Sequence, residues 1–441
     1  MGIKVCKFGG SSLADAAHFQ RVRDILLADP QRRFVVASAP GKRDKADEKV
    51  TDLLYQCYRA VERKQPAEEI FARVAGRYMD IANALGLENG MQKVLEDTFA
   101  EIVRQKSPDF TASRGEYLNA FLLARYLGWD FIDAKDYVKF DRQGVFASEW
   151  TNEILAAALR EHECAVLPGF YGSLPNGEIH TFSRGGSDIS GAIVARAAEA
   201  EIYENWTDVS GFLMADPRIV ANPLPIRHVT YHEMHALASA GATVLHEDSV
   251  APVSQDGIPT QIRNTNDPSH PGTLITSTAV RRENFSIFAG IAGKKGYSLL
   301  LAEKQHRDAS PAFMQGVFQA AQHCGMDFQL LSVNGSHLCL LIETEQYETK
   351  SIGFWEEISE MGVPYFHSVE PGFACIVLVG YGVVHNYQTI NRIYKALQKR
   401  EIEVSMITQG MSEISTWVAV QEDDMEDAIR TLYEEFCRDT H

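Results

Sequence analysis

The sequence has no apolar run long enough to cross a membrane. Its longest apolar stretch, residues 375–384, is interrupted by glycine, whereas a membrane-spanning helix needs about 20 consecutive apolar residues. The N-terminus lacks the apolar segment of a secretory signal, and Cys6 stands where a myristoylation signal has Ser or Thr. We therefore expect a soluble, cytoplasmic protein without a membrane partner.

Cysteines are few and scattered, and none belongs to a C-x-x-C pair. An odd number of isolated cysteines indicates reduced thiols, which usually pack as small apolar side chains. The seven are Cys6, Cys57, Cys164, Cys324, Cys339, Cys375 and Cys437.

Excess positive charge is also missing. The 441 residues include 42 Lys and Arg against 59 Asp and Glu, a net charge of −17. Binding to nucleic acid needs clustered cations, so we exclude a nucleic acid partner and expect any phosphate site to be built locally. The length and the apolar content of 45% predict two or three domains, each with its own core.

Two common nucleotide-binding motifs, G-x-x-x-x-G-K-[ST] and G-x-G-x-x-G, are absent from the N-terminal turn. Instead an apolar strand at residues 3–8 runs into Gly9, Gly10 and two serines before a helical pattern begins. Glycine amides can approach an anion closely, and a helix start adds unpaired donors and partial positive charge. With Lys7 just before the glycines, the pattern predicts a phosphate-binding turn, although an ordinary glycine turn with a surface lysine has the same short signature.

Strands alternate with helices as far as about residue 280. Apolar patterns predict strands at 34–38, 163–170 and 201–206, and helices over 13–26, 50–61, 114–127 and 187–200. This alternation predicts an α/β fold, a three-layer sandwich on a mostly parallel sheet. We assign residues 1–280 to this first domain.

The pattern changes after a Pro-containing linker at 267–272. A helical segment at 317–320 recurs at 393–396, and a strand at 325–332 recurs at 401–408 with the same offset. Each unit reads as strand, helix, strand, turn, strand and second helix, which predicts two ferredoxin-like βαββαβ modules. We place them at 281–369 and 370–441 and allow that the two interleave.

A second glycine-rich helix start lies at residues 181–192. Apolar residues follow at helical spacing, so we expect Ser187 to be the N-cap and Asp188 to lie in the first turn. Arg184 stands at the mouth of this helix, where a guanidinium can hold a carboxylate or phosphate, while a first-turn acid can hold a metal or an ammonium group. A well-capped helix with a solvated arginine is the alternative.

A third stretch, residues 206–218, leaves a predicted strand and enters an acidic loop. Ligands bind at the carboxyl ends of strands in open α/β sheets, so we expect this loop near the N-terminal turn. Two helix starts, at 51–54 and 114–117, are consistent with simple caps. The histidines between 228 and 235 lack the H-E-x-x-H spacing, so we expect no metal site formed by the protein there.

Four motifs together resemble the aspartate kinase family in their order and spacing. They are K-F-G-G-S-S at 7–12, R-G-G-S-D at 184–188, W-T-D-V at 206–209 with D-P-R at 216–218, and G-A-T-V-L-H at 241–246. The family has an amino acid kinase domain followed by two ACT modules, so the resemblance covers nearly the whole chain. It implies that MgATP phosphorylates the side-chain carboxylate of L-aspartate to 4-phospho-L-aspartate, the first step toward lysine, threonine and methionine.

The resemblance also implies roles for individual residues. Lys7 and Asp188 would be catalytic, with Lys7 stabilising charge on the transferred phosphoryl group. Arg184 would hold the substrate's α-carboxylate, and Glu116 and Asp188 would hold its amine. The aspartate site would contain Ser38, Thr51, Glu116, Arg184 and Ser187, and the nucleotide site Lys7, Gly9, Gly10, Thr207, Asp208, Leu213, Arg218, Thr243 and Val244. Mg²⁺ would arrive with ATP, and no protein ligand to it is assigned.

Two positions depart from the family pattern. Thr243 lies where the family usually has a lysine close to ATP, and Leu213 lies where a tyrosine commonly sits beside adenosine. Losing one charge-assisted hydrogen bond costs about 1.5–3 kcal/mol of nucleotide binding unless Arg218 or another cation compensates. We interpret the chain as a divergent subclass of the family.

The ACT pair is similar to amino acid sensors, which implies a lysine or threonine effector and a homodimer or larger homo-oligomer. Residues 406–415 are close to the family pattern, whereas residues 332–336 are not, so a role in dimerisation alone stays open. Two other functions also stay open. One is an amino acid kinase that acts on another acceptor such as glutamate, and the other is a catalytically weakened amino acid sensor.

Overall fold

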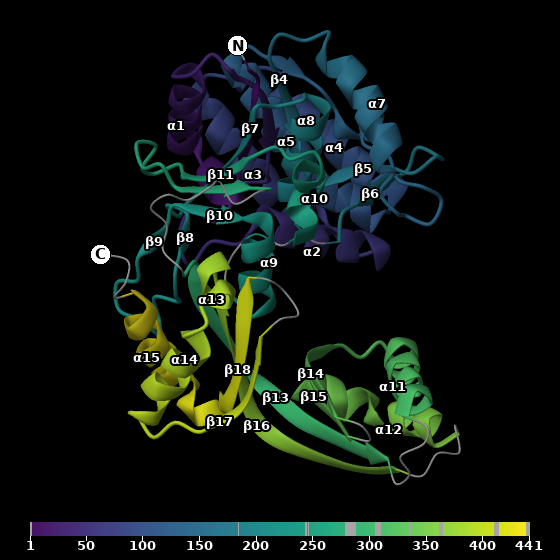
Figure 1. Cartoon of the computed structure of the whole chain (residues 1–441). Helices are drawn as coiled ribbons and strands as arrows, with labels where there is room; N and C mark the ends of the chain where they lie inside the picture. The colour runs from purple at the N-terminus through teal and green to yellow at the C-terminus, as the bar shows by residue number, and fades with distance from the viewer. Residues whose placement is uncertain are drawn as a thin grey trace. The chain divides into compact units, whose positions relative to one another are not determined.

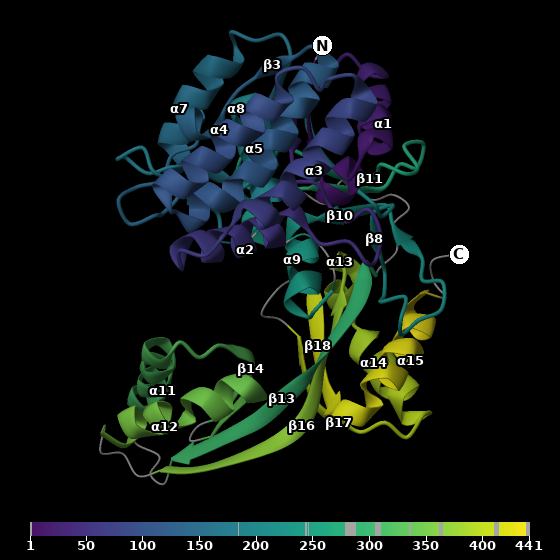
Figure 2. The ribbon, with the colours of Figure 1, turned by 180° about the vertical axis from the view of Figure 1, so that it is seen from behind.

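The structure is a computed structural model of the whole chain. It describes residues 2–183, 185–242, 245, 247–277, 288–304, 310–334, 337–360, 365–409 and 414–437. The chain divides into two compact units (Figures 1 and 2). The first contains Met1–Phe212, Pro225–Met234 and Leu245–Val280, and the second contains Leu213–Leu224, His235–Val244 and Arg281–His441.

The cysteines are reduced, and no helix in the described part of the chain is suited to span a membrane. None of the seven cysteines, all of which lie in the described part, takes part in a disulfide bond. Among the helices of the described residues, none combines the length and the apolar character that crossing a membrane requires.

An eight-stranded sheet organises the first unit, in the order β10-β12-β11-β7-β1-β2-β4-β3. All neighbouring strands are parallel except β11 and β12, which confirms the predicted mostly parallel sheet. The strands are β1 (Lys4–Phe8), β2 (Arg32–Ala37), β3 (Asp130–Phe131), β4 (Ala165–Pro168), β7 (Ile202–Thr207), β10 (His228–Thr230), β11 (Thr260–Asn264) and β12 (Thr273–Thr276). Outside this sheet lie β5 (Tyr171–Ser173), β6 (Ile179–Thr181), β8 (Phe212–Leu213) and β9 (Pro225–Ile226).

Two groups of helices cover the two faces of this sheet (Figures 1 and 2). The first group is α1 (Ala16–Leu27), α2 (Val50–Glu62), α3 (Glu68–Leu85), α4 (Met91–Gln105) and α5 (Pro108–Leu127). The second is α7 (Ser148–Leu159), α8 (Gly186–Ala197) and α10 (Glu247–Gln255). Shorter elements are η1 (Gly10–Leu13), α6 (Ala134–Tyr137) and α9 (Tyr231–Ser239). The predicted three-layer sandwich is confirmed, and its central strands are buried on both faces, as parallel sheets require.

Local capping explains where two predicted helices begin. The first starts at Ala16 rather than residue 13, because the Asp15 carboxylate accepts a hydrogen bond from the amide of His18 at 3.0 Å. The helix predicted over 114–127 starts earlier, at Pro108, where Ser107 is the N-cap and proline suits the first turn.

The second unit contains a six-stranded antiparallel sheet in the order β14-β15-β13-β16-β18-β17. Its strands are β13 (Gly290–Lys304), β14 (Phe328–Asn334), β15 (His337–Glu343), β16 (Tyr365–Val379), β17 (Val404–Gln409) and β18 (Ser415–Gln421). Its helices are α11 (Ser310–Cys324), α12 (Thr344–Glu360), α13 (Tyr381–His385), α14 (Thr389–Gln398) and α15 (Met425–Cys437), with a short turn η3 (Glu422–Asp424).

The predicted internal repeat corresponds to the two halves of this sheet. In each half a repeated helix, α11 or α14, leads into an edge strand, β14 or β17. The central strands β13 and β16 are 15 residues long and run through both halves. Their pairing shifts register beside Gly296 (φ +86°) and Gly372 (φ +96°), a conformation that glycine adopts without steric cost. The two modules therefore share both long strands.

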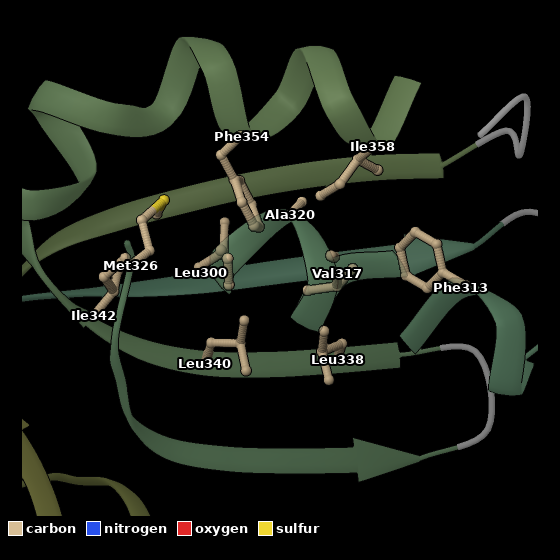
Figure 3. Close-up of a cluster of buried hydrophobic side chains, with 12 residues drawn as sticks. Leu300, Phe313, Val317, Ala320, Met326, Leu338, Leu340, Ile342, Phe354 and Ile358 are labelled. Carbon is tan, nitrogen blue, oxygen red and sulfur yellow. The ribbon is translucent and has the colours of Figure 1, made fainter. Parts of the chain in front are cut away.

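Figure 3 shows the apolar core of the half that contains α11 and α12. Phe354 and Ile358 from α12 and Val317 from α11 cover the sheet residues Leu300 and Leu340, and each of these side chains is at most 1% exposed. The aromatic ring of Phe354 also contacts Phe328 and Trp355.

Replacing Phe354 by alanine tests this packing. We expect Phe354→Ala to lower the free energy of unfolding of this region by about 3–5 kcal/mol, because a large buried ring leaves a cavity. Ile352 on the same helix is 76% exposed, so Ile352→Ala is the matched control and should change stability by less than about 0.5 kcal/mol. Urea unfolding measures both, and equal effects of the two variants would contradict the assignment of the core.

Candidate active site

The carboxyl ends of four central strands meet at one edge of the first unit. The amide of Gly9, just after β1, donates to the carbonyl of Trp206 on β7 at 3.0 Å. The amide of Ser38, just after β2, donates to the carbonyl of Phe8 at 3.1 Å, and Gly169 after β4 donates to Ala37 at 3.0 Å. The four segments that follow these strands are therefore neighbours, as predicted for a ligand site in an open α/β sheet.

The turn after β1 is a 3₁₀ segment, η1, which leaves backbone donors at its start. The first hydrogen bond of this turn runs from the amide of Ser12 to the carbonyl of Gly9 at 3.0 Å. The amides of Gly10 and Ser11 therefore come before the first bond within the turn, where a helix start can bind an anion. Since the amide of Gly9 is used between β1 and β7, Gly10 and Ser11 are the donors that this turn offers.

Glycine is required at position 10 by a close approach of two backbones. The amide of Gly41, in the loop after β2, donates to the carbonyl of Gly10 at 2.8 Å. A Cβ added to Gly10 would lie 2.8 Å from the carbonyl oxygen of Ala39, and a Cβ added to Gly41 would lie 2.6 Å from the carbonyl carbon of Gly10. The buried Arg77 on α3 holds the same loop by donating to the carbonyl of Gly41 at 2.8 Å.

Lys7 and Asp188 form an ion pair at the centre of this edge. Lys7 Nζ lies 2.6 Å from Asp188 Oδ1, and the two side chains are 9% and 27% exposed. A Cβ at Gly9 would lie 3.5 Å from Lys7 Nζ, so the ammonium is beside the glycine turn. The structure thus brings together the two glycine-rich helix starts that the sequence singled out.

The start of α8 differs from the sequence-based expectation in one respect. Gly185 is the N-cap, with φ +67° and no side-chain hydrogen bond, so the prediction that Ser187 caps this helix is wrong. The left-handed conformation at Gly185 lets the helix begin two residues earlier, and Asp188 still lies in its first turn. The side chain of Ser187 instead lies against Gly169, where an added Cβ would be 2.7 Å from Ser187 Oγ.

Glu116 is a buried acid on α5, close to the end of β2. Its side chain accepts a hydrogen bond from the amide of Ala39, and burial raises the pKa of its carboxyl to about 8. The residue is 6% exposed, and within the described residues its Oε2 atom has no hydrogen-bond partner. A buried carboxyl with one oxygen that lacks a hydrogen-bond partner is suited to a cationic ligand. Ser38 follows β2 directly and precedes Ala39 in the chain, and Thr51 lies in the first turn of α2.

The predicted nucleotide residues divide between the two units. Thr207 is the last residue of β7 and Asp208 follows it in the first unit, where the carbonyl of Thr207 accepts a hydrogen bond from the amide of Thr265 at 2.8 Å. Leu213 and Arg218 belong to the second unit, where Arg218 Nε lies 3.0 Å from the carboxylate of Asp216. Arg184, Thr243 and Val244 lie outside the described residues.

Two asparagines at this edge were missed by the sequence analysis. Asn205 on β7 donates from Nδ2 to Asp188 Oδ1 at 2.7 Å, and its Oδ1 lies 3.5 Å from Lys7 Nζ. Asn119 on α5 donates to the carbonyl of Ser38 at 2.6 Å. For Asn205 the sequence did contain a signal, because this amide lies inside the predicted strand at 201–206. A polar side chain buried in a strand needs a hydrogen-bond partner.

The raised pKa of Glu116 predicts a dependence of stability on pH. An unfolded glutamate has a pKa near 4.3, so the folded chain retains a proton that the unfolded chain loses, and stability falls as pH rises from about 4.5 through about 8. Glu116→Gln should remove this loss. Between pH 5 and pH 8.5 the free energy of unfolding of the parent chain should therefore fall by up to about 4 kcal/mol more than that of the variant. Thermal unfolding across this range measures it, with the exposed Glu96→Gln on α4 as the control. A constant difference between Glu116→Gln and the parent chain at all pH values would contradict the burial of an ionisable group here.

Comparison with known proteins agrees with this geometry. The amino acid kinase family profile matches residues 2–264, and an ACT domain profile matches residues 376–436. The chain is 35% identical to aspartokinase 3 of Bacillus subtilis over 454 residues, which covers 98% of both chains. It is 26% identical to the lysine-sensitive aspartokinase 3 of Escherichia coli, again over 98% of both chains.

Solved structures show the same similarity. The crystal structure of aspartate kinase from Clostridium acetobutylicum superposes with a TM-score of 0.92 at 40% identity, covering 98% of this chain and 100% of that one. Escherichia coli aspartokinase III in complex with aspartate and ADP has a TM-score of 0.76 at 24% identity, covering 98% and 99%, and so shares the fold. The family profile spans more than half of the chain and the Bacillus relative spans nearly all of it, so the chain belongs to the aspartokinases, enzymes of the amino acid kinase family that phosphorylate aspartate.

Proposed function

We propose that the first unit transfers the γ-phosphoryl group of MgATP to the side-chain carboxylate of L-aspartate at the edge where Lys7 meets Asp188. The observation that supports this most directly is the 2.6 Å contact between the Lys7 ammonium and the Asp188 carboxylate beside a glycine turn. A cation next to the backbone donors of a glycine turn can stabilise the charge that develops on a transferred phosphoryl group.

The residues around the turn fit a nucleotide phosphate. The amides of Gly10 and Ser11 precede the first hydrogen bond of η1, and the closeness of Gly10 to Ala39 excludes any side chain at that position. The start of α8 adds partial positive charge at the same edge. When bound, MgATP supplies the phosphoryl group and a divalent cation. We assign Thr207 and Asp208, at the end of β7, to its nucleotide side.

The remaining polar side chains fit an amino acid with two carboxylates. Glu116, which has a carboxylate oxygen without a partner in the described residues, receives the substrate ammonium, together with Asp188. Ser38, Thr51 and Ser187 complete the pocket, and Arg184 holds the α-carboxylate. The attacking carboxylate is already ionised at neutral pH, so positioning and charge neutralisation do the chemistry and no general base is required. Binding an ammonium at Glu116 also favours its charged form, so aspartate binding releases a proton below about pH 8.

We assign residues 1–280 to the catalytic domain and residues 281–369 and 370–441 to two ACT modules. In this assignment the ACT modules bind a free amino acid and join chains into a homodimer or larger homo-oligomer. The support is the ACT match at 376–436 and the name of the E. coli relative, a lysine-sensitive aspartokinase. Part of the motif at 406–415 lies outside the described residues.

Removing either member of the ion pair tests the catalytic site. We expect Lys7→Met and Asp188→Asn each to lower turnover by at least about 100-fold, because each removes charge stabilisation from the transition state. Trapping of acyl phosphate by hydroxylamine, with L-aspartate or L-glutamate as the acceptor, measures turnover and identifies the substrate. Lys4→Met is the matched control, since Lys4 lies at the other end of β1 and pairs with Asp29 at 2.8 Å. Normal turnover by Lys7→Met would remove this residue from the mechanism, and hydroxamate formed only with L-glutamate would exclude the aspartate assignment.

Adding free amino acids to the same assay tests regulation. If the ACT modules bind lysine, millimolar L-lysine should lower activity while D-lysine, which has the same charge, should not. L-threonine alone and both amino acids together are the further conditions. Full activity under every condition would leave the modules with a role in dimerisation, which light scattering of the purified protein measures separately.

A further inference from the structure

Strand β7 presents alternate side chains to opposite faces of the sheet. In its parallel pairing with β1, Asn205 lies beside Lys7, and Glu204 lies beside Cys6. Tyr203 and Asn205 therefore share the face that α8 covers, while Glu204 points to the other face. The residue next to the lysine of the site is thus fixed by the register of two central strands.

Two side chains of β7 hold the same residue of α8. The hydroxyl of Tyr203 donates to the backbone carbonyl of Asp188 at 3.0 Å, and Asn205 Nδ2 donates to the carboxylate oxygen Oδ1 of Asp188 at 2.7 Å. Lys7 Nζ contacts this same Oδ1 at 2.6 Å. Two side-chain donors, one from β1 and one from β7, therefore bind the same oxygen of this carboxylate.

The amide of Asn205 suits both charges of the ion pair. Its NH₂ group faces the carboxylate, which only accepts hydrogen bonds, and its oxygen lies 3.5 Å from the ammonium of Lys7. Asn205 is 2% exposed, so water does not replace a lost contact. An aspartate at this position would repel Asp188 and compete for Lys7, and a leucine would leave the carboxylate without its second donor.

We propose that Asn205 is a positioning residue of the phosphoryl-transfer site, because its amide holds the Asp188 carboxylate against the Lys7 ammonium. This inference rests on the proposed function of the site. Asn205 acts through Asp188 and Lys7 and does not itself touch a reacting atom. Its loss should therefore lower kcat and, because Asp188 also receives the substrate ammonium, raise the KM for L-aspartate, while the KM for ATP changes little.

A double-mutant cycle between Asn205 and Asp188 tests this role. In the otherwise unchanged full chain, Asn205→Leu and Asn205→Asp should lower kcat by on the order of 10- to 100-fold, the effect of one hydrogen bond to a charged group. The KM for ATP should stay within about threefold, whereas the KM for L-aspartate should rise. In the Asp188→Asn background the same substitutions should lower the residual kcat by less than about threefold, because the carboxylate through which Asn205 acts is absent.

The control for a purely structural effect is Thr151→Val. Thr151 is fully buried, and its hydroxyl accepts a hydrogen bond from the amide of Lys139 at 2.9 Å, so this variant also removes a buried hydrogen bond from the first unit. It should lower the melting temperature without lowering kcat. If Asn205→Leu does not fold, the nearly isosteric Asn205→Asp carries the test.

The outcomes separate this inference from the function on which it rests. Equal losses of kcat in both backgrounds, no loss in either, or a change confined to KM would overturn the role of Asn205. Normal turnover by Lys7→Met or Asp188→Asn would instead overturn the proposed site. A loss in these two variants together with full activity of both Asn205 variants would leave the site intact and reject only the positioning role.

Discussion

A lysine ammonium and an aspartate carboxylate meet 2.6 Å apart at the carboxyl ends of the central strands, and the rest of the site is arranged around this contact. The Lys7 side chain is only 9% exposed. Burial of an ion pair adds little to stability, because desolvation offsets most of the attraction between the charges. We therefore interpret the pair as a functional feature that keeps a cation beside the glycine turn before substrate arrives.

The contact depends on a fixed register between β1 and its neighbour β7. On the opposite face of β7, Glu204 is 1% exposed and binds Arg32 at 2.8 Å, Trp206 Nε1 at 2.9 Å and Arg263 at 3.5 Å. These residues come from β2, β7 and β11, so one carboxylate ties three strands together. A slip of one residue would turn Lys7 to the other face. The charged cluster on one face thus keeps the site on the other face in register.

Much of this arrangement could be predicted from the sequence, because backbone patterns carry it. The glycine turn at Gly9 and Gly10 and the helix start around Asp188 were recognised from residue types and order, and their proximity follows from the topology of a parallel sheet. Asn205 could not be predicted in the same way. A polar residue inside an apolar strand shows that a buried partner exists but not which one, and the partner here is far away in sequence.

The wrong prediction of the N-cap of α8 has a similar cause, because residue types alone do not show which backbone conformation the chain adopts. Ser187 is a good N-cap by propensity, but Gly185 adopts a left-handed conformation and starts the helix earlier. Ser38, Thr51 and Glu116 were assigned by resemblance, and the structure adds the reason that Glu116 suits a cation. Its carboxyl is buried, its pKa is raised to about 8, and one of its oxygens lacks a partner within the described residues.

The central claim is that the glycine turn and the start of α8 form a single site for nucleotide phosphate and aspartate. A crystal structure of the protein with a non-hydrolysable ATP analogue, Mg²⁺ and L-aspartate tests it most directly. The account predicts phosphate oxygens on the amides of Gly10 and Ser11 and on Lys7 Nζ, with the aspartate ammonium at Glu116. Phosphates bound away from Lys7, or an aspartate that does not contact Glu116 or Asp188, would contradict it.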